Sequence, residues 1–211
     1  MKKLSAFIVI ATVCGTFFLS RCSENKTGET NNQKDTVLVG SKSNGGYESQ
    51  VKWGEHLVMY MGCGDCHTPK KMGPMGPEDD STLLLSGHPA KMPAPDVDRK
   101  EMESKGLFVT GTLTAWVGPW SISYSANLTS DDSGIGTWNE DQFLFAIRNG
   151  KLKGLAGSRM LLPPMPWQSI RYLADDELKA MFVYLKSTKP ISNIVSPPAP
   201  PVVQRKIVNK D

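Results

Sequence analysis

Cys63 and Cys66, followed directly by His67, carry the most specific chemistry in this sequence. Two intervening residues let one helical turn present both thiols to one edge of a flat ring, with the histidine beside a metal at its centre. The pattern Cys-x-x-Cys-His is typical of covalent haem attachment. In that arrangement the cysteines form thioether bonds and the histidine is the proximal iron ligand. We therefore predict one covalently bound haem c at these three residues.

Paired cysteines also occur in two other kinds of site. A redox-active disulfide of the thioredoxin type accompanies a βαβ pattern, which this sequence lacks. A structural zinc site needs further Cys or His ligands at regular spacing, and the sequence has no second Cys pair or His pair to supply them. Haem attachment is therefore the interpretation that the motif favours.

A haem held by one histidine has a second axial position, where methionine is the commonest ligand in electron-carrying cytochromes. Met165 differs from the other methionines because it lies in Leu162-Pro163-Pro164-Met165-Pro166-Trp167. Proline fixes φ, so this loop is stiff enough to hold a weakly binding thioether. The alternatives are Met160 as the nearest rival, then Met72, Met75, Met92, His88 and His56.

Three segments have the apolar periodicity of helices that would position this site. Residues 48–61 lead directly into the motif, and their apolar stripe is Trp53, Leu57, Val58, Tyr60 and Met61. Gly54 within this segment indicates that another helix crosses closely, since glycine otherwise weakens a helix.

The other two predicted helices lie nearer the C-terminus. One begins at the capping residue Asn139 and stops at Asn149-Gly150, with Phe143, Ala146 and Ile147 on one face. The last helix, over residues 174–187, has an apolar stripe of Leu178, Met181, Phe182 and Leu185.

Residues 69–137 are rich in Pro and Gly and show little periodicity. We predict ordered loops that wrap the haem, with residues 107–113 and 121–125 as short strands or extended loops.

The N-terminus has the features of a bacterial export signal over residues 1–21: Lys2 and Lys3 precede an apolar stretch that is too short to span a bilayer. Leu19-Ser20-Arg21-Cys22 resembles a lipoprotein cleavage site, so we predict a lipid on Cys22, although Arg21 departs from that pattern. Export agrees with haem c, which bacteria attach on the outer side of the inner membrane.

The remaining boundaries follow from composition. Residues 22–46 are polar and form a predicted flexible tether, residues 47–190 form the folded domain, and residues 191–211 form a Pro-rich basic tail. The formal net charge of +3 is too small and too scattered to indicate binding to nucleic acid.

Over about residues 51–192 the chain resembles the class I cytochrome c superfamily, and in particular single-haem cytochrome c subunits and domains of bacterial periplasmic dehydrogenases. The similar segments are residues 53–58, the haem motif with its flanks at 62–69, Asn127-Leu128-Thr129, Gly134-Ile135-Gly136-Thr137-Trp138, Pro164-Met165-Pro166-Trp167 and the closing helix at 178–185. The resemblance implies an all-α fold with long ordered loops around one haem. It also implies Cys63 and Cys66 as thioether residues, His67 as proximal ligand and Met165 as distal ligand.

These expectations describe an electron carrier rather than an enzyme. The predicted protein is exported, is tethered to a membrane by lipid, and passes single electrons from a dehydrogenase to an oxidase or another cytochrome. Lysines such as Lys70 and Lys71 would ring an exposed haem edge. The alternative is a haem-based redox enzyme or small-ligand sensor with an open sixth iron site.

Overall fold

The computed structural model describes residues 44–106 and 108–202 of this chain. The predicted export signal over residues 1–21, the predicted lipidation of Cys22 and most of the predicted tether lie outside these ranges. Among the helices that the structure describes, none has the length and apolar character needed to cross a bilayer.

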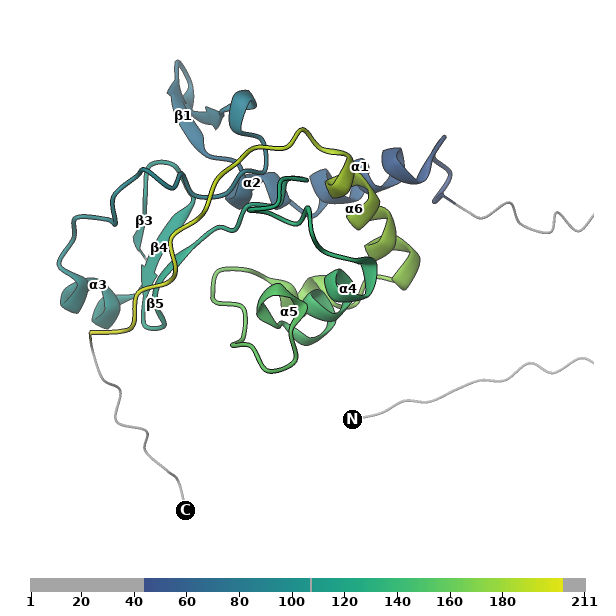
Figure 1. The fold of residues 1–211 in the computed structure, drawn as a ribbon. Coiled ribbons are helices and arrows are strands. Elements are labelled where there is room, and N and C mark those ends of the chain that lie inside the picture. The colour runs from purple at the N-terminus through teal and green to yellow at the C-terminus, as the bar shows by residue number, and fades with distance from the viewer. Residues whose placement is uncertain (1–43, 107, 203–211) are drawn as a thin grey trace, which may run out of the picture. The chain divides into compact units, whose positions relative to one another are not determined.

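Two groups of strands lie between the first helices and the last ones along the chain, with an α-helix between the two groups (Figure 1). The helices are α1 (Gln50–Tyr60), α2 (Cys63–His67), α3 (Arg99–Lys105), α4 (Glu140–Asn149), α5 (Trp167–Ile170) and α6 (Asp175–Ser187), with short 3-10 turns η1 (Ser81–Leu83) and η2 (Leu152–Gly154). The strands are β1 (Lys70–Gly73), β2 (Gly76–Asp79), β3 (Phe108–Val109), β4 (Ala115–Gly118) and β5 (Ser121–Tyr124).

The prediction of an all-α fold is wrong, because residues 70–124 form two antiparallel sheets. One is the β1–β2 hairpin and the other has the strand order β3–β4–β5. Short segments bounded by Gly and Pro turn back tightly, so neighbouring segments pair as hairpins. Ser121–Tyr124 form β5, and among the described residues 108–113 the strand comprises Phe108 and Val109. The central strand β4 is buried along its whole length.

Helices α1 and α6 cross at Gly54, as the sequence predicts. A Cβ atom at this glycine would lie 1.9 Å from the carbonyl oxygen of Ala180 in α6, so only glycine fits. The four apolar residues predicted as the stripe of α6 are all buried. In α1, Leu57 and Val58 are buried, but Tyr60 is 79% exposed and does not belong to the core.

The Gly54→Ala variant is expected to lose about 3 kcal/mol of unfolding free energy, near the upper end of the usual cost of overpacking. The better helix propensity of alanine offsets only about 1 kcal/mol of the clash with Ala180. Urea unfolding followed by circular dichroism measures this difference. Gly157→Ala is the control, because an added Cβ there meets nothing within 4 Å. Equal stability of the two variants would contradict the close crossing.

Local signals set the ends of α4 and α6. The side chain of Asn139 accepts a hydrogen bond from Gln142 N at 2.8 Å, and Gly150 ends α4 in the left-handed conformation, as predicted. Helix α6 begins without a capping hydroxyl. Instead, the Glu177 carboxylate accepts a hydrogen bond from Ala174 N at 2.7 Å.

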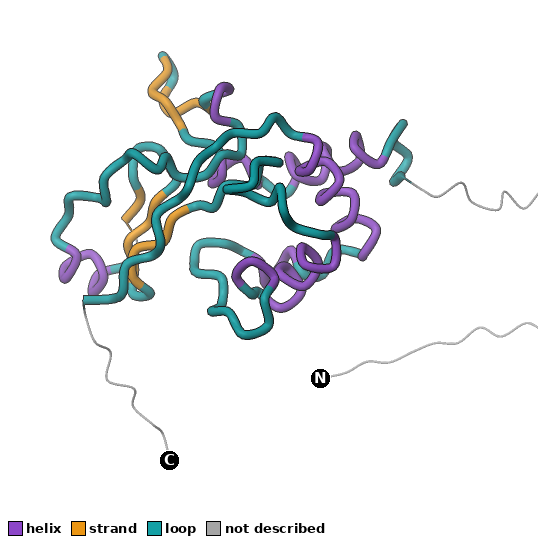
Figure 2. Tube along the Cα trace, in the orientation of Figure 1, coloured by secondary structure: helices purple, strands orange, loops and turns teal. Residues whose placement is uncertain are grey.

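Figure 2 shows α1, α4, α5 and α6 gathered together, with the β3–β4–β5 sheet beside α3. The apolar core lies mainly among the helices and includes Phe143, Ile170, Leu178 and Phe182. Helix α2, which carries the cysteine motif, follows α1 directly and contacts it. The hairpin β1–β2 comes directly after α2 in the chain.

Candidate cofactor site

The three motif residues lie on one short helical turn. Gly62 separates α1 from α2 with φ of 65°, a conformation that glycine adopts at no steric cost. A Cβ at Gly62 would lie 2.7 Å from Oδ2 of Asp65. The predicted single turn that carries both cysteines is confirmed by α2, which starts at Cys63 and ends at His67.

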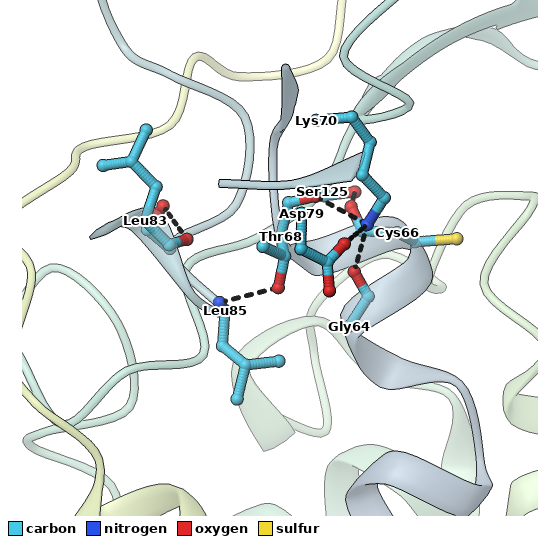
Figure 3. Close-up of polar contacts among 9 residues, drawn as sticks. Gly64, Cys66, Thr68, Lys70, Asp79, Leu83, Leu85 and Ser125 are labelled. Carbon is cyan, nitrogen blue, oxygen red and sulfur yellow. Dashed lines mark hydrogen bonds and ion pairs between the residues drawn. The ribbon is translucent and has the colours of Figure 1, made fainter. Parts of the chain in front are cut away.

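The carbonyl groups at the end of α2 are bonded to distant parts of the chain. Such groups have no partner within a helix this short. The Ser125 hydroxyl donates to the Cys66 carbonyl oxygen at 2.5 Å, and Gly87 N donates to the His67 carbonyl oxygen at 2.8 Å. Figure 3 shows the Ser125 contact, with the Cys66 sulfur directed away from it. These two hydrogen bonds therefore fix the backbone of α2, while the Cys66 thiol points away from Ser125.

The imidazole of His67 is oriented by a backbone carbonyl. Its Nδ1 lies 2.8 Å from the carbonyl oxygen of Ala126, which can only accept, so Nδ1 carries the proton. The ring is buried, and burial lowers the pKa of His67. A neutral imidazole in this tautomer presents a lone pair at Nε2, which is the arrangement of a metal-ligating histidine.

Both motif cysteines are free thiols. Burial raises the pKa of Cys63 to about 12, and burial also raises the pKa of Cys66. Redox-active Cys-x-x-Cys pairs depend on a lowered thiol pKa. These two thiols therefore lack the character of a thioredoxin-like pair.

The thiols and the imidazole face a large cavity of about 960 Å³. This is near the upper end of the roughly 300–1,000 Å³ common for cofactor and ligand sites. Cys63, Cys66 and His67 line it together with Met165. Its other walls are largely apolar and include Trp116, Leu128, Ile135, Trp138, Phe143 and Ile147. A flat, mostly apolar macrocycle with a metal centre matches this combination of volume, thiols, imidazole and thioether.

Met165 is the one residue among the seven axial candidates from the sequence that lines this cavity. Its loop is held by two bonds. Met165 N donates to the Leu162 carbonyl oxygen at 3.2 Å, and the Ser123 hydroxyl of β5 donates to the Pro163 carbonyl oxygen at 2.6 Å. The six alternatives, Met160, Met72, Met75, Met92, His88 and His56, are not among the lining residues.

His88, the stronger of the two alternative histidines, is fixed elsewhere. The residue is 1% exposed, its ring packs with the centroid 4.9 Å from that of Tyr124, and its Nδ1 lies 2.9 Å from the Thr114 hydroxyl oxygen. The backbone N of His88 also donates to the Ser125 carbonyl oxygen at 2.9 Å. This histidine joins a loop to the β3–β4–β5 sheet.

Two methionines that the sequence did not single out also line the cavity. Met61 follows α1, and Met181 is a buried residue of α6. Met181 belongs to the predicted apolar stripe of α6. The periodicity of that stripe predicted that Met181 is buried, but it could not predict that Met181 lines this cavity. Both compete with Met165 as sources of a thioether.

The C-terminal strap, which we define as residues 191–202, forms another wall of the cavity through residues 194–198. One end is held by Asn193, whose Nδ2 donates to the carbonyl oxygens of Ser86 and His88 at 2.7 and 2.9 Å. Figure 1 shows this strap leading from α6 past the strands toward α3.

The other end of the strap contacts α3 and β5. Arg99 Nη2 donates to the Pro200 carbonyl oxygen at 2.5 Å, and Val202 N donates to Oε2 of Glu103 at 2.8 Å. Ala199 pairs with Ile122 of β5 as an antiparallel bridge. The first residues of the segment assigned to a tail by sequence thus contribute to the candidate site.

Three relatives among known proteins are informative, although no family model matches the chain. The chain is 27% identical over 150 residues, 69% of its length, to the cytochrome c subunit of alcohol dehydrogenase (quinone) from Gluconacetobacter polyoxogenes. It is 36% identical over 67 residues, 31% of its length, to the gluconate 2-dehydrogenase cytochrome c subunit of Pantoea cypripedii. It is 33% identical over 88 residues, 41% of its length, to the fructose dehydrogenase cytochrome subunit of Gluconobacter japonicus.

The chain is related to cytochrome c subunits of dehydrogenases. The matched regions cover 26%, 14% and 17% of those three relatives, so the similarity concerns part of each protein. This relation agrees with the prediction of a cytochrome c. Membership of the class I superfamily stays a prediction.

Proposed function

We propose that this protein is a single-haem c-type cytochrome that carries one electron at a time from a dehydrogenase to a respiratory acceptor. The observation that carries the proposal is that Cys63, Cys66, His67 and Met165 all line one cavity. The relation to cytochrome c subunits of dehydrogenases supports the cofactor and the kind of donor. The bound haem would supply an iron that cycles between two oxidation states.

The cysteines would anchor the cofactor covalently. Each thiol would form one thioether bond to a vinyl group of the cofactor, an addition that would need no oxidant. His67 would bind the iron through Nε2, since Nδ1 is occupied by the Ala126 carbonyl. Met165 would supply a thioether ligand to the iron, and such a ligand raises the reduction potential relative to two nitrogen ligands.

The cavity walls would keep water from the redox centre. Trp116, Ile135 and Phe143 are buried or nearly so, and each borders the cavity. An apolar, rigid surrounding lowers the rearrangement that accompanies electron transfer and tunes the potential.

The proposed location and partners rest on the N-terminal residues and on the relatives. The predicted signal over residues 1–21 would export the chain, and lipid on Cys22 would tether it to a membrane at the periplasmic or outer surface. A dehydrogenase would donate electrons, and an oxidase or another cytochrome would accept them through a small transient contact.

An intact-mass measurement and a visible spectrum of the exported protein test this proposal together. We expect the mass of the chain plus one haem, and a low-spin spectrum in both oxidation states. The oxidised protein should show the weak band near the red end that arises from iron–thioether charge transfer. A bare dithiol would refute haem attachment, and carbon monoxide binding to the reduced protein would favour an enzyme or sensor with an open iron site.

A further inference from the structure

The ammonium of Lys70 is buried and fully hydrogen-bonded behind the motif helix (Figure 3). The Lys70 side chain is 8% exposed. Its Nζ donates to the Gly64 carbonyl oxygen at 2.8 Å, to the Thr68 carbonyl oxygen at 3.0 Å, and lies 2.5 Å from Oδ1 of Asp79. An ammonium has three donors, and all three have acceptors here. A buried cation without such partners would be strongly destabilising.

Two of these three acceptors belong to the motif or follow it directly. Gly64 lies between the cysteines, and Thr68 is the residue after His67. One ammonium therefore bridges the beginning and the end of α2. This contact fixes the same turn whose other carbonyl groups bind Ser125 and Gly87.

The third acceptor is delivered by the β1–β2 hairpin. Lys70 and Asp79 are directly paired in its register, so the hairpin returns the carboxylate to the ammonium at the end of α2. The next pair along the hairpin, Lys71 and Glu78, lies on the exposed side. Their charged atoms are 3.7 Å apart, and both side chains are more than half exposed.

The Lys70 charge lies close to the residues that face the cavity. Its Nζ bonds to the carbonyl oxygen of Gly64, which stands between the two cysteines, and to that of Thr68, which follows His67. A buried charge interacts more strongly than a solvated one, because water does not screen it. Lys70, which the sequence predicted to lie at an exposed haem edge, is thus a buried cation beside the motif.

We propose that Lys70 is a positioning residue for the haem-attachment helix, and that the Lys70–Asp79 ion pair tunes the reduction potential of the haem. This inference rests on the proposed function. Reduction adds one electron and no proton, so a fixed positive charge nearby favours the reduced state. The opposing carboxylate favours the oxidised state.

Four variants of the haem-loaded protein test this assignment by redox titration. We expect Lys70→Met to lower the reduction potential and Asp79→Asn to raise it, because the two changes remove charges of opposite sign. Lys71→Met and Glu78→Gln remove the same two charges from the exposed neighbouring pair. Lys71→Met should shift the potential by less than half as much as Lys70→Met, because water screens the exposed Lys71 ammonium but not the buried one. Glu78→Gln should also have a smaller effect than Asp79→Asn, because Asp79 pairs with the buried ammonium at 2.5 Å whereas Glu78 lies 3.7 Å from an exposed one. Lys70→Met should also decrease the fraction of chains with haem attached by two thioethers.

Several outcomes would overturn the inference. Shifts of the same sign from Lys70→Met and Asp79→Asn would indicate a purely structural effect. Equal shifts from Lys70→Met and Lys71→Met would exclude a special role for the buried lysine. If Lys70→Met does not fold, Asp79→Asn still tests the inference, since this half-exposed carboxylate can be neutralised without leaving a buried cavity. An unchanged reduction potential in Asp79→Asn would refute the proposal that the ion pair tunes the potential. Failure of the proposed function itself would appear differently, as wild-type protein without haem.

Discussion

Replacement of both Cys63 and Cys66 by alanine is expected to abolish covalent haem attachment completely. The two thiols line the cavity from a single helical turn. Without sulfur no thioether can form, although His67 and Met165 would still offer axial ligands. We expect the intact mass to fall to that of the bare chain, and acidified solvent to extract all haem from the folded protein.

Single replacements provide the controls for this experiment. Cys63→Ala or Cys66→Ala leaves one thiol, so we expect one thioether and a haem that resists extraction. The reduced absorption maximum should shift to longer wavelength, because one vinyl group remains. Both variants keep His67 and Met165. Covalent haem in the double variant would refute the assignment of these cysteines.

Replacement of Met165 by alanine is expected to remove the iron–thioether band and to lower the reduction potential. A thioether ligand raises the potential, so its loss favours the oxidised state. We also expect the reduced variant to bind carbon monoxide, which the wild type should resist. Visible spectroscopy and redox titration measure these effects.

Two other cavity methionines make this a discriminating comparison. Met61→Ala and Met181→Ala should retain the thioether band if Met165 is the ligand. Met181 is 3% exposed, so its replacement should instead cost about 2–5 kcal/mol of unfolding free energy. Met160→Ala is a surface control, because Met160 is 41% exposed and does not line the cavity. Loss of the band in the Met61 or Met181 variant alone would transfer the ligand role to that residue.

The helical elements could be predicted because their signals are local. The cap at Asn139, the stop at Gly150 and the apolar stripe of α6 each depend on residues within two turns of one another. Gly54 also indicated a helix crossing, since a glycine inside a helix needs a reason in packing. The one-turn geometry of α2 was likewise contained in the motif spacing.

The sequence did not predict the two sheets, and the reason is physical. Strands of two to four residues carry too few residues for a period of two to stand out from a Pro- and Gly-rich segment. Their stability comes from pairing and burial, as in β4, and both depend on other segments. The resemblance to an all-α superfamily reinforced the error.

By itself the sequence determined the chemistry available here: two thiols, an imidazole beside them, and a methionine held between prolines. Only the tertiary structure decided which residues meet. It placed Met165 at the cavity and His88 away from it, turned Lys70 inward, and brought the strap around residues 194–198 to the site. The physical reason is that these contacts join residues far apart in the chain, such as Asn193 and Ser86, whose proximity depends on how every intervening segment packs.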